Sequence, residues 1–264
     1  MRTTKSPAPR VLLVLAGLAL TFLVLPLIGL LIETPWSELP ALLTSTAATE
    51  ALRLSLLTSV LAAAVATVLG VPLAWVLARI DFPGQRVVRG IVLLPLVLPP
   101  VVGGVALLTV FGRRGLVGQY LYDWFGVQLP FSTAGVVMAE AFVAMPFLVI
   151  TVEGALRNID PRFEQAARTL GASPRRVLFT ITLPMISASL VAGVVLAWAR
   201  ALGEFGATIT FAGNFPGVTQ TLPLAVYSAL EVDRDEAIAL SMVLLAVSFT
   251  VLISLRGRFL GSRS

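Results

Sequence analysis

Six apolar runs separated by shorter polar segments make up most of the chain. The first run, at about 11–32, holds 22 residues and no charge. A helix rises about 1.5 Å per residue, so this run would be ~33 Å long, enough to cross the hydrocarbon core of a bilayer. The pattern predicts membrane-spanning helices at about 11–32, 51–78, 87–111, 133–152, 185–205 and 237–255, with polar tails at 1–10 and 256–264.

A secretory signal peptide would also begin with a basic tail followed by an apolar run. The run at 11–32 is longer than the roughly 7–15 apolar residues of such a peptide, and no small-residue cleavage site follows it. We therefore interpret this run as a retained first span.

Three predicted spans contain residues that are uncommon in membrane helices. The third span holds Pro95, Pro99 and Pro100, so we expect a kink that serves either packing or a transport pathway. In the fourth span, Glu140 lies roughly 9 to 10 Å from the outer end by helix rise, where a carboxyl group needs an interhelical hydrogen bond or a proton. In the fifth span, Arg200 and Glu204 are four residues apart on one predicted helix and can pair.

The longest polar interruption in the second half of the chain lies at 157–184 and has the spacing of folded structure. Asp160 can cap a helix whose first residue is Pro161, and Gly171 is suited to end it. Ser173 and the proline after it repeat this start for a second helix that runs to Pro184. The apolar face of the first helix would consist of Phe163, Ala166, Ala167 and Leu170. Such a pair of short helices either lies on the membrane surface or docks on a partner, and periodicity alone favours neither.

Composition assigns the chain to the integral membrane proteins of the all-α class. Hydrophobic residues make up 57% of the chain and charged residues 12%, and the mean hydropathy is +0.94. Because the chain has no cysteine and no histidine, disulfides, thiol chemistry and the usual zinc or haem ligand sets are excluded, and any catalysis would have to use carboxylates or hydroxyls. We predict no metal site and no catalytic residue in this chain. The only lysine, Lys5, lies in the N-terminal tail and cannot serve a phosphate-binding loop. Any nucleotide energy must therefore come from another chain.

The distribution of basic residues predicts the orientation of the spans. With six spans and a cytoplasmic N-terminal tail, the outer segments hold only Arg113, Arg114 and Arg234. The inner segments then hold Arg2, Lys5, Arg10, Arg79, Arg86, Arg89, Arg157, Arg162, Arg168, Arg175, Arg176, Arg256, Arg258 and Arg263. This asymmetry is typical of cytoplasmic loops, so it places both termini and the 157–184 segment in the cytoplasm. The same scattering argues against nucleic-acid binding despite the net charge of +5.

Within 157–184 the spacing of several residues resembles the EAA---G---------I-LP signature of permease subunits of ATP-binding-cassette (ABC) importers. The resemblance implies the transmembrane domain of a type I importer, in which this segment is the coupling helix that seats in a groove of the ATPase subunit. The residues that would couple to the ATPase are Glu164, Gln165, Ala166, Ala167, Gly171, Ile181 and Pro184. One departure is that Gln165 occupies the family's glutamate position, and Glu164 lies one place earlier, about 100° around the helix.

Three further stretches resemble the oxyanion branch of these permeases. LPLVLPP at 94–100 is similar to a motif of the third span, and ALGEFGAT at 201–208 is shared by molybdate and sulfate permeases. The stretch 212–227, with TQTLPLAVY, is closest to the molybdate type. The resemblance implies a homodimer in a bacterial or archaeal cytoplasmic membrane, two ATP-binding subunits that hold ATP and magnesium, and an extracytoplasmic molybdate-binding protein. This chain itself would carry no cofactor.

The region after the fifth span supplies candidates for a transport pathway and gate. They are Arg200, Gly203, Glu204, Gly206, Thr208 and Thr210. The glycines allow close approach or a break, and the hydroxyl groups suit weak contact with a tetrahedral dianion. The alternatives are that Arg200 and Glu204 only neutralise each other's charge, and that the threonines are polar merely because they lie in a loop.

Two other functions stay open. Sulfate, thiosulfate or tungstate could be the cargo of the same architecture. A channel or ion-coupled carrier would need no ATPase, but the absence of an internal repeat and the few buried ionisable residues argue against it.

Overall fold

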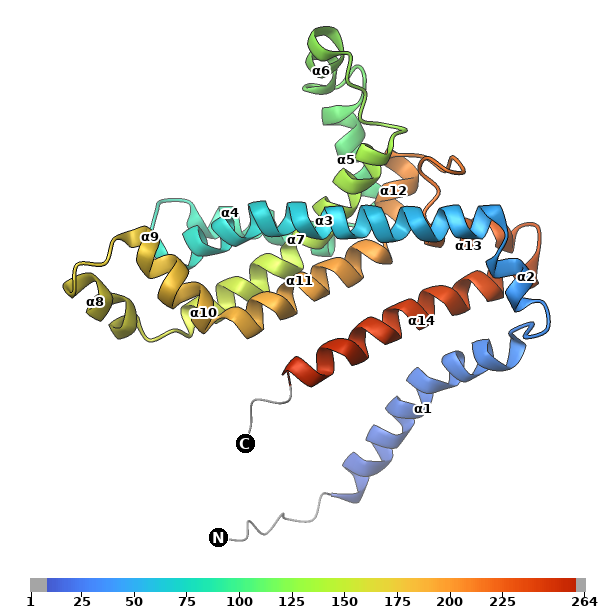
Figure 1. The fold of residues 1–264 in the computed structure, drawn as a ribbon, viewed down its shortest axis with the longest axis horizontal. Helices are drawn as coiled ribbons and strands as arrows, with labels where there is room; N and C mark the ends of the chain where they lie inside the picture. The colour runs from blue at the N-terminus through green and yellow to red at the C-terminus, as the bar shows by residue number, and fades with distance from the viewer. Residues whose placement is uncertain (1–8, 260–264) are drawn as a thin grey trace.

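The computed structural model describes residues 9–259, and within them every regular element is a helix (Figure 1). The long helices are α1 (Arg10–Glu33), α3 (Thr46–Arg79), α7 (Thr133–Arg157), α11 (Ser187–Leu202) and α14 (Arg234–Phe259). The shorter ones are α2 (Leu39–Leu43), α4 (Gln85–Val97), α5 (Pro100–Phe111), α6 (Gly118–Phe125), α8 (Pro161–Thr169), α9 (Pro174–Val177), the π-helix η1 (Leu178–Thr182), α10 (Leu183–Met185), α12 (Gly206–Phe211) and α13 (Leu222–Leu230).

The centre of the molecule is formed by α3, α7 and α11, which pack side by side (Figure 1). Their interface is built from alanines and β-branched or leucine side chains, all buried. Small residues let membrane helices approach closely, so van der Waals contact can hold them together where lipid removes the hydrophobic driving force. The main members of this core are Ala62, Ala74, Leu77, Ala144, Leu148, Val152, Ala197 and Ala201.

The first predicted span is confirmed as a continuous helix, α1, and it leaves the bundle rather than joining its core. No residue of α1 is buried, and its side chains are apolar on every face. Its C-terminal end is tied to the start of α14 by an ion pair of 3.0 Å between Glu33 Oε2 and Arg234 Nη2. A helix that is apolar all round suits a lipid environment or a membrane partner.

The third predicted span, 87–111, deviates at its prolines as expected, but by a break between two helices rather than a bend within one. It is broken into α4 and α5, whose axes differ by 118°. The residues between them, Leu98 and Pro99, have extended backbone with ψ of 135° and 132°. The residue before a proline avoids helical conformation, and two successive prolines follow Leu98, so the chain turns here instead of bending gently.

The fifth predicted span is also shorter than 185–205 and is not one helix. It begins after a 75° bend between α10 and α11 and ends at Leu202. Gly203 to Phe205 connect it to α12, so Arg200 and Glu204 do not share a helix as predicted.

By length and apolarity, α1, α3 and α7 can each cross a membrane, and counting each of two bent pairs as one span raises the number to five among the described residues. The second and fourth spans extend beyond 51–78 and 133–152, to Thr46–Arg79 and Thr133–Arg157. The sixth predicted span, 237–255, lies within α14. The tails at 1–8 and 260–264 lie outside the described residues.

Candidate functional site

The polar segment at 157–184 forms a lobe at one end of the bundle, made of α8, α9 and η1 (Figure 1). The predicted starts of both helices and the predicted end of the first are confirmed. The Asp160 side chain accepts a hydrogen bond from the Arg162 amide at 2.9 Å, and the Ser173 hydroxyl accepts one from the Arg176 amide at 3.4 Å. Gly171 follows α8 with a φ of +84°, which a glycine adopts without strain. Local sequence therefore determines where these short helices begin and end.

The second helix of this segment is not a continuous α-helix. It widens to a π-helix at Leu178–Thr182, where the Leu183 amide donates to the Leu178 carbonyl five residues earlier. Pro184 explains the change, because it has no amide hydrogen and its ring would clash with the carbonyl four residues before it. A single wider turn relieves that crowding and lets the helix continue.

The apolar stripe of α8 faces away from the protein. Leu170 is 89% exposed and Phe163 55%, and no residue of α8 is buried. Gln165, Ala166, Gly171 and Pro184 are exposed as well, whereas Ala167 and Ile181 are half-buried. The exposed stripe is thus available to a partner.

Glu164 is oriented toward the protein rather than toward solvent. Its Oε1 lies 2.9 Å from Nη2 of Arg79 at the end of α3, and it accepts a 2.9 Å hydrogen bond from the hydroxyl of Thr182. The exposed fraction of its side chain is only 12%. Sequence reasoning placed Glu164 among the ATPase-coupling residues and had no signal for these partners, which are 85 and 18 residues away.

The same end of α3 holds a second ionic cluster that sequence analysis missed. Glu153 Oε1 accepts hydrogen bonds from Nε of Arg89 at 3.0 Å and Nε of Arg157 at 2.9 Å. The Leu77 carbonyl, near the C-terminus of α3, accepts from Arg157 and from Gln85, each at 2.9 Å. Cationic groups at a helix C-terminus also interact favourably with its dipole. The cluster therefore joins α3, α4 and α7.

The pathway candidates gather around the break between α11 and α12. Nη2 of Arg200 lies 2.5 Å from Oε2 of Glu204, close enough for an ion pair although not aligned as a hydrogen bond. The other carboxylate oxygen of Glu204 accepts a 2.8 Å bond from the Ala207 amide and so caps α12. The predicted pair therefore exists, and Glu204 also stabilises the start of the next helix.

The other pathway candidates differ in how much of their hydrogen-bonding capacity is free. Gly203 is exposed in the break, and Gly206 is buried at the start of α12. The Thr210 hydroxyl donates to the Gly206 carbonyl at 2.8 Å, which is ordinary within a helix. The buried Thr208 hydroxyl has no hydrogen-bond partner among the residues that the structure describes. Of the two threonines, only Thr208 has an unused hydroxyl.

Glu140 makes the interhelical hydrogen bond that its position requires. Its side chain is 1% exposed, and its Oε1 accepts a 2.9 Å bond from the hydroxyl of Thr58 on α3. Its second oxygen has no hydrogen-bond partner in the part of the chain that the structure describes. A hydrogen bond between α3 and α7 was one of the two alternatives that the sequence left open.

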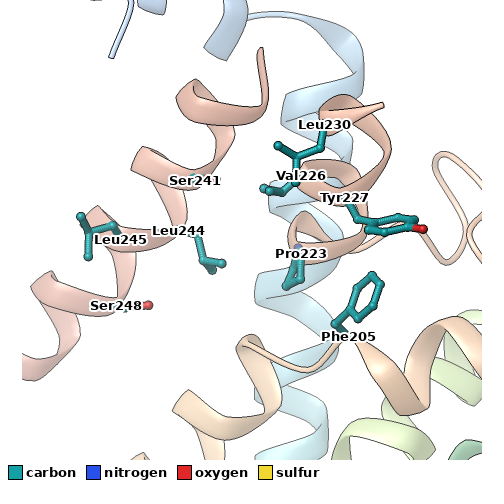
Figure 2. Close-up of a pocket in the computed structure, with 9 residues that line it drawn as sticks. All are labelled: Phe205, Pro223, Val226, Tyr227, Leu230, Ser241, Leu244, Leu245 and Ser248. Carbon is teal, nitrogen blue, oxygen red and sulfur yellow. The ribbon is translucent and has the colours of Figure 1, made fainter. Parts of the chain in front are cut away.

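A groove of about 510 Å³ separates α13 from α14 next to this break (Figure 2). The rings of Phe205 and Tyr227 lie at its edge with centroids 5.1 Å apart. Its other lining residues are Pro223, Val226 and Leu230 from α13 and Ser241, Leu244, Leu245 and Ser248 from α14. None of them is basic, so the groove offers an anion only hydroxyl groups.

Comparison with known proteins connects this geometry to a family. Residues 70–263 match the family of the "Binding-protein-dependent transport system inner membrane component". The molybdenum transport system permease protein ModB of Mycobacterium tuberculosis is 46% identical over 250 residues, which cover 95% of this chain and 94% of that protein. ModB of Escherichia coli K12 is 45% identical over 203 residues, 77% of this chain and 89% of that protein.

A more distant sequence relative and a solved structure are also similar to this chain. The sulfate transport system permease protein CysT of Salmonella typhimurium is 35% identical over 237 residues, 88% of this chain and 85% of that protein. A chain from the crystal structure of a bacterial ABC transporter involved in alginate import superposes with a TM-score of 0.78 at 20% identity, covering 97% of this chain and 95% of that chain. The protein described here therefore belongs to the binding-protein-dependent transport system inner membrane components.

Proposed function

We propose that this chain is the membrane-spanning permease subunit of an ATP-driven importer that carries molybdate across the cytoplasmic membrane. The observation that supports the cargo most directly is the level of identity, 46% with a molybdenum permease against 35% with a sulfate permease. The runner-up cargo is sulfate, because that relative also spans most of the chain. Tungstate and thiosulfate are alternatives with the same tetrahedral shape.

Energy for transport would come from two ATPase subunits that bind ATP and magnesium and dock on the segment at 157–184. In support of this, Phe163 of α8 is 55% exposed and Leu170, directly after α8, is 89% exposed among the residues that the structure describes. A helix with an unpartnered apolar stripe fits a groove on another protein. The docking surface would include Gln165, Ala166, Ala167, Gly171, Ile181 and Pro184. This chain would itself hydrolyse no ATP.

Two copies of this chain would form a homodimer around a shared pathway, with both termini in the cytoplasm. The fully exposed α1 is in keeping with contact to lipid or to a second copy. An extracytoplasmic binding protein would deliver molybdate to the opposite side of the membrane. Closure of the ATPases would draw the two 157–184 segments together and tilt the spans between inward-facing and outward-facing states.

The gate would lie at the break between α11 and α12. There Gly203 and Gly206 flank Glu204, and Arg200 remains 27% exposed while paired. A paired arginine presents little net field, so an oxyanion would bind weakly and be released. The hydroxyl of Thr208 is the next candidate contact and that of Thr210 a weaker one, because it is already hydrogen-bonded.

Uptake of labelled molybdate into proteoliposomes tests this function. The permease is reconstituted with its ATPase subunits, its binding protein and internal ATP, and uptake should stop when ATP is omitted. Competition by unlabelled sulfate, thiosulfate and tungstate then ranks the cargoes, and tighter competition by sulfate than by molybdate would refute the molybdate assignment. Uptake that continues without ATP would indicate a channel or carrier.

A further inference from the structure

Helix α8 has few means of holding its position, although the lobe that carries it is anchored elsewhere by buried Val177, which is 3% exposed. None of the residues of α8 is buried, so burial of apolar surface contributes little to its attachment. Its neighbours α9 and η1 are adjacent in sequence and belong to the same lobe. What fixes α8 relative to the membrane helices must therefore be sought among its polar contacts.

One side chain supplies such a contact. A single oxygen of Glu164, Oε1, is shared by Nη2 of Arg79 and the hydroxyl of Thr182, each at 2.9 Å. The exposed fractions of the Glu164 and Arg79 side chains are 12% and 17%, and Thr182 is 1% exposed. A charged pair with this little exposure is screened much less than a surface ion pair. This three-residue brace joins α8, the end of α3 and the π-helix.

Arg79 is well placed to pass a displacement into the membrane helices. Two residues earlier on the same turn, the Leu77 carbonyl is held by Arg157 of α7 and by Gln85 of α4. α3 is 34 residues, about 51 Å, long, and toward its other end Thr58 donates to Glu140. Still nearer that end, the Ser55 hydroxyl accepts a 2.6 Å bond from the Leu222 amide at the start of α13. Moving the Arg79 end of α3 therefore acts on α4, α7 and α13.

We propose that Glu164 is a positioning residue, which transmits movement of the ATPase-docking segment to α3 through Arg79 and Thr182. This inference rests on the proposed function, because it assumes that α8 docks on an ATPase. It assigns Glu164 to a contact within the chain and leaves Gln165, exposed at the next position, to face the partner. Loss of the brace should let α8 move without moving α3, so ATP would be hydrolysed with less transport.

Three variants of the full-length permease, each assembled with its ATPase subunits and binding protein, test the brace. Glu164→Gln keeps an acceptor for Thr182 but removes the charge, and Arg79→Met removes the cation. The exchange Arg79→Glu with Glu164→Arg restores a pair of opposite charges, and the Thr182 hydroxyl can accept where it previously donated. Arg86→Gln is the matched control, because Arg86 is an exposed arginine of the neighbouring helix α4 and takes part in none of the ion pairs between described residues.

The measured quantity is the ATP hydrolysed per oxyanion imported, together with the amount of ATPase subunit that co-purifies. For Glu164→Gln and Arg79→Met we expect the ratio to rise about five-fold or more, with co-purification unchanged. The exchange should recover at least half of the loss, and the control should behave as wild type. An unchanged ratio in Glu164→Gln overturns the inference. So does loss of the ATPase in Glu164→Gln but not in Arg79→Met, since Glu164 would then contact the partner directly.

A second measurement does not depend on the cargo. If the wild-type complex imports no oxyanion, the proposed function fails, and hydrogen exchange of the permease alone in lipid nanodiscs still tests the brace. Glu164→Gln and Arg79→Met should each speed exchange of the amides at 162–169 and 178–183 by about five-fold or more, and Arg86→Gln should not. Equal exchange in all four proteins would show that the brace does not hold α8.

Discussion

Replacing Gly104 by alanine should separate α5 from α12 and destabilise the protein. A Cβ atom at this position would lie 2.6 Å from Cβ of Thr210 and 2.8 Å from the carbonyl oxygen of Ala207. Ordinary contacts of such an atom begin at 3.4 Å, so the two helices would have to move apart by nearly 1 Å. The Ala207 oxygen belongs to the backbone, and the Cβ atom of Thr210 is bonded directly to it. Neither atom can therefore move aside by rotation of a side chain.

The magnitude follows from two opposing effects. Overpacking a well-packed interface costs about 1–3 kcal/mol. Alanine in a helix interior is favoured over glycine by about 1 kcal/mol. The matched control is Gly154→Ala in α7, where the new Cβ meets nothing within 4 Å and only the favourable effect applies. We therefore expect the control to be up to about 1 kcal/mol more stable than wild type, and Gly104→Ala to lie about 1–3 kcal/mol below the control.

Thermal unfolding in detergent, followed by loss of monodisperse protein, compares the three proteins. Oxyanion uptake by the assembled complex is measured in parallel, because Thr210 and Ala207 lie on the helix that Glu204 caps. Gly104→Ala should unfold at a lower temperature than Gly154→Ala and at no higher temperature than wild type, and it should transport more slowly. If Gly104→Ala is as stable as Gly154→Ala, α5 and α12 do not approach as closely as described.

Three further predictions concern separate parts of the molecule. Gly171→Val should abolish uptake while leaving membrane insertion and expression intact, because β-branched residues avoid a φ of +84°; normal uptake in this variant would contradict the coupling role of the segment. Leu170→Asp should reduce co-purification of the ATPase subunit at least ten-fold without lowering the stability of the isolated permease, since the side chain is 89% exposed; full retention would mean that the ATPase docks elsewhere. A double-mutant cycle of Thr58→Val and Glu140→Met, measured by thermal unfolding, should give a coupling energy of about 0.6–1.7 kcal/mol, and a value near zero would exclude their hydrogen bond.

The local features of the 157–184 segment were predictable because each depends on neighbouring residues. Asp160 and Ser173 cap the next helix with side chains two or three residues away from the amides they bind. Gly171 ends α8 through its own backbone conformation. The family signature is equally local, and the match to residues 70–263 bears it out.

For the broken spans, the sequence predicted the position of each break but not its size. Prolines and glycines in the sequence indicated where the backbone would deviate, as at Pro99 and Gly203. They did not indicate the size of the change, a 118° turn in one case and a new helix in the other. The turn angle depends on what the second half packs against, and α5 packs on α12, a helix more than a hundred residues further along the chain.

The sequence by itself determined the class of protein, the caps of the short helices and the family, since apolar length, capping chemistry and motif spacing act over a few residues. Only the tertiary structure decided what Glu164 and Glu140 bind. Periodicity shows which residues share a helix face but not what that face meets. The partners of these carboxylates are 85 and 82 residues away, and packing alone brings them within 2.9 Å. For Glu164 the tertiary structure also decided that this charged side chain faces the protein, while Phe163 and Leu170 are exposed.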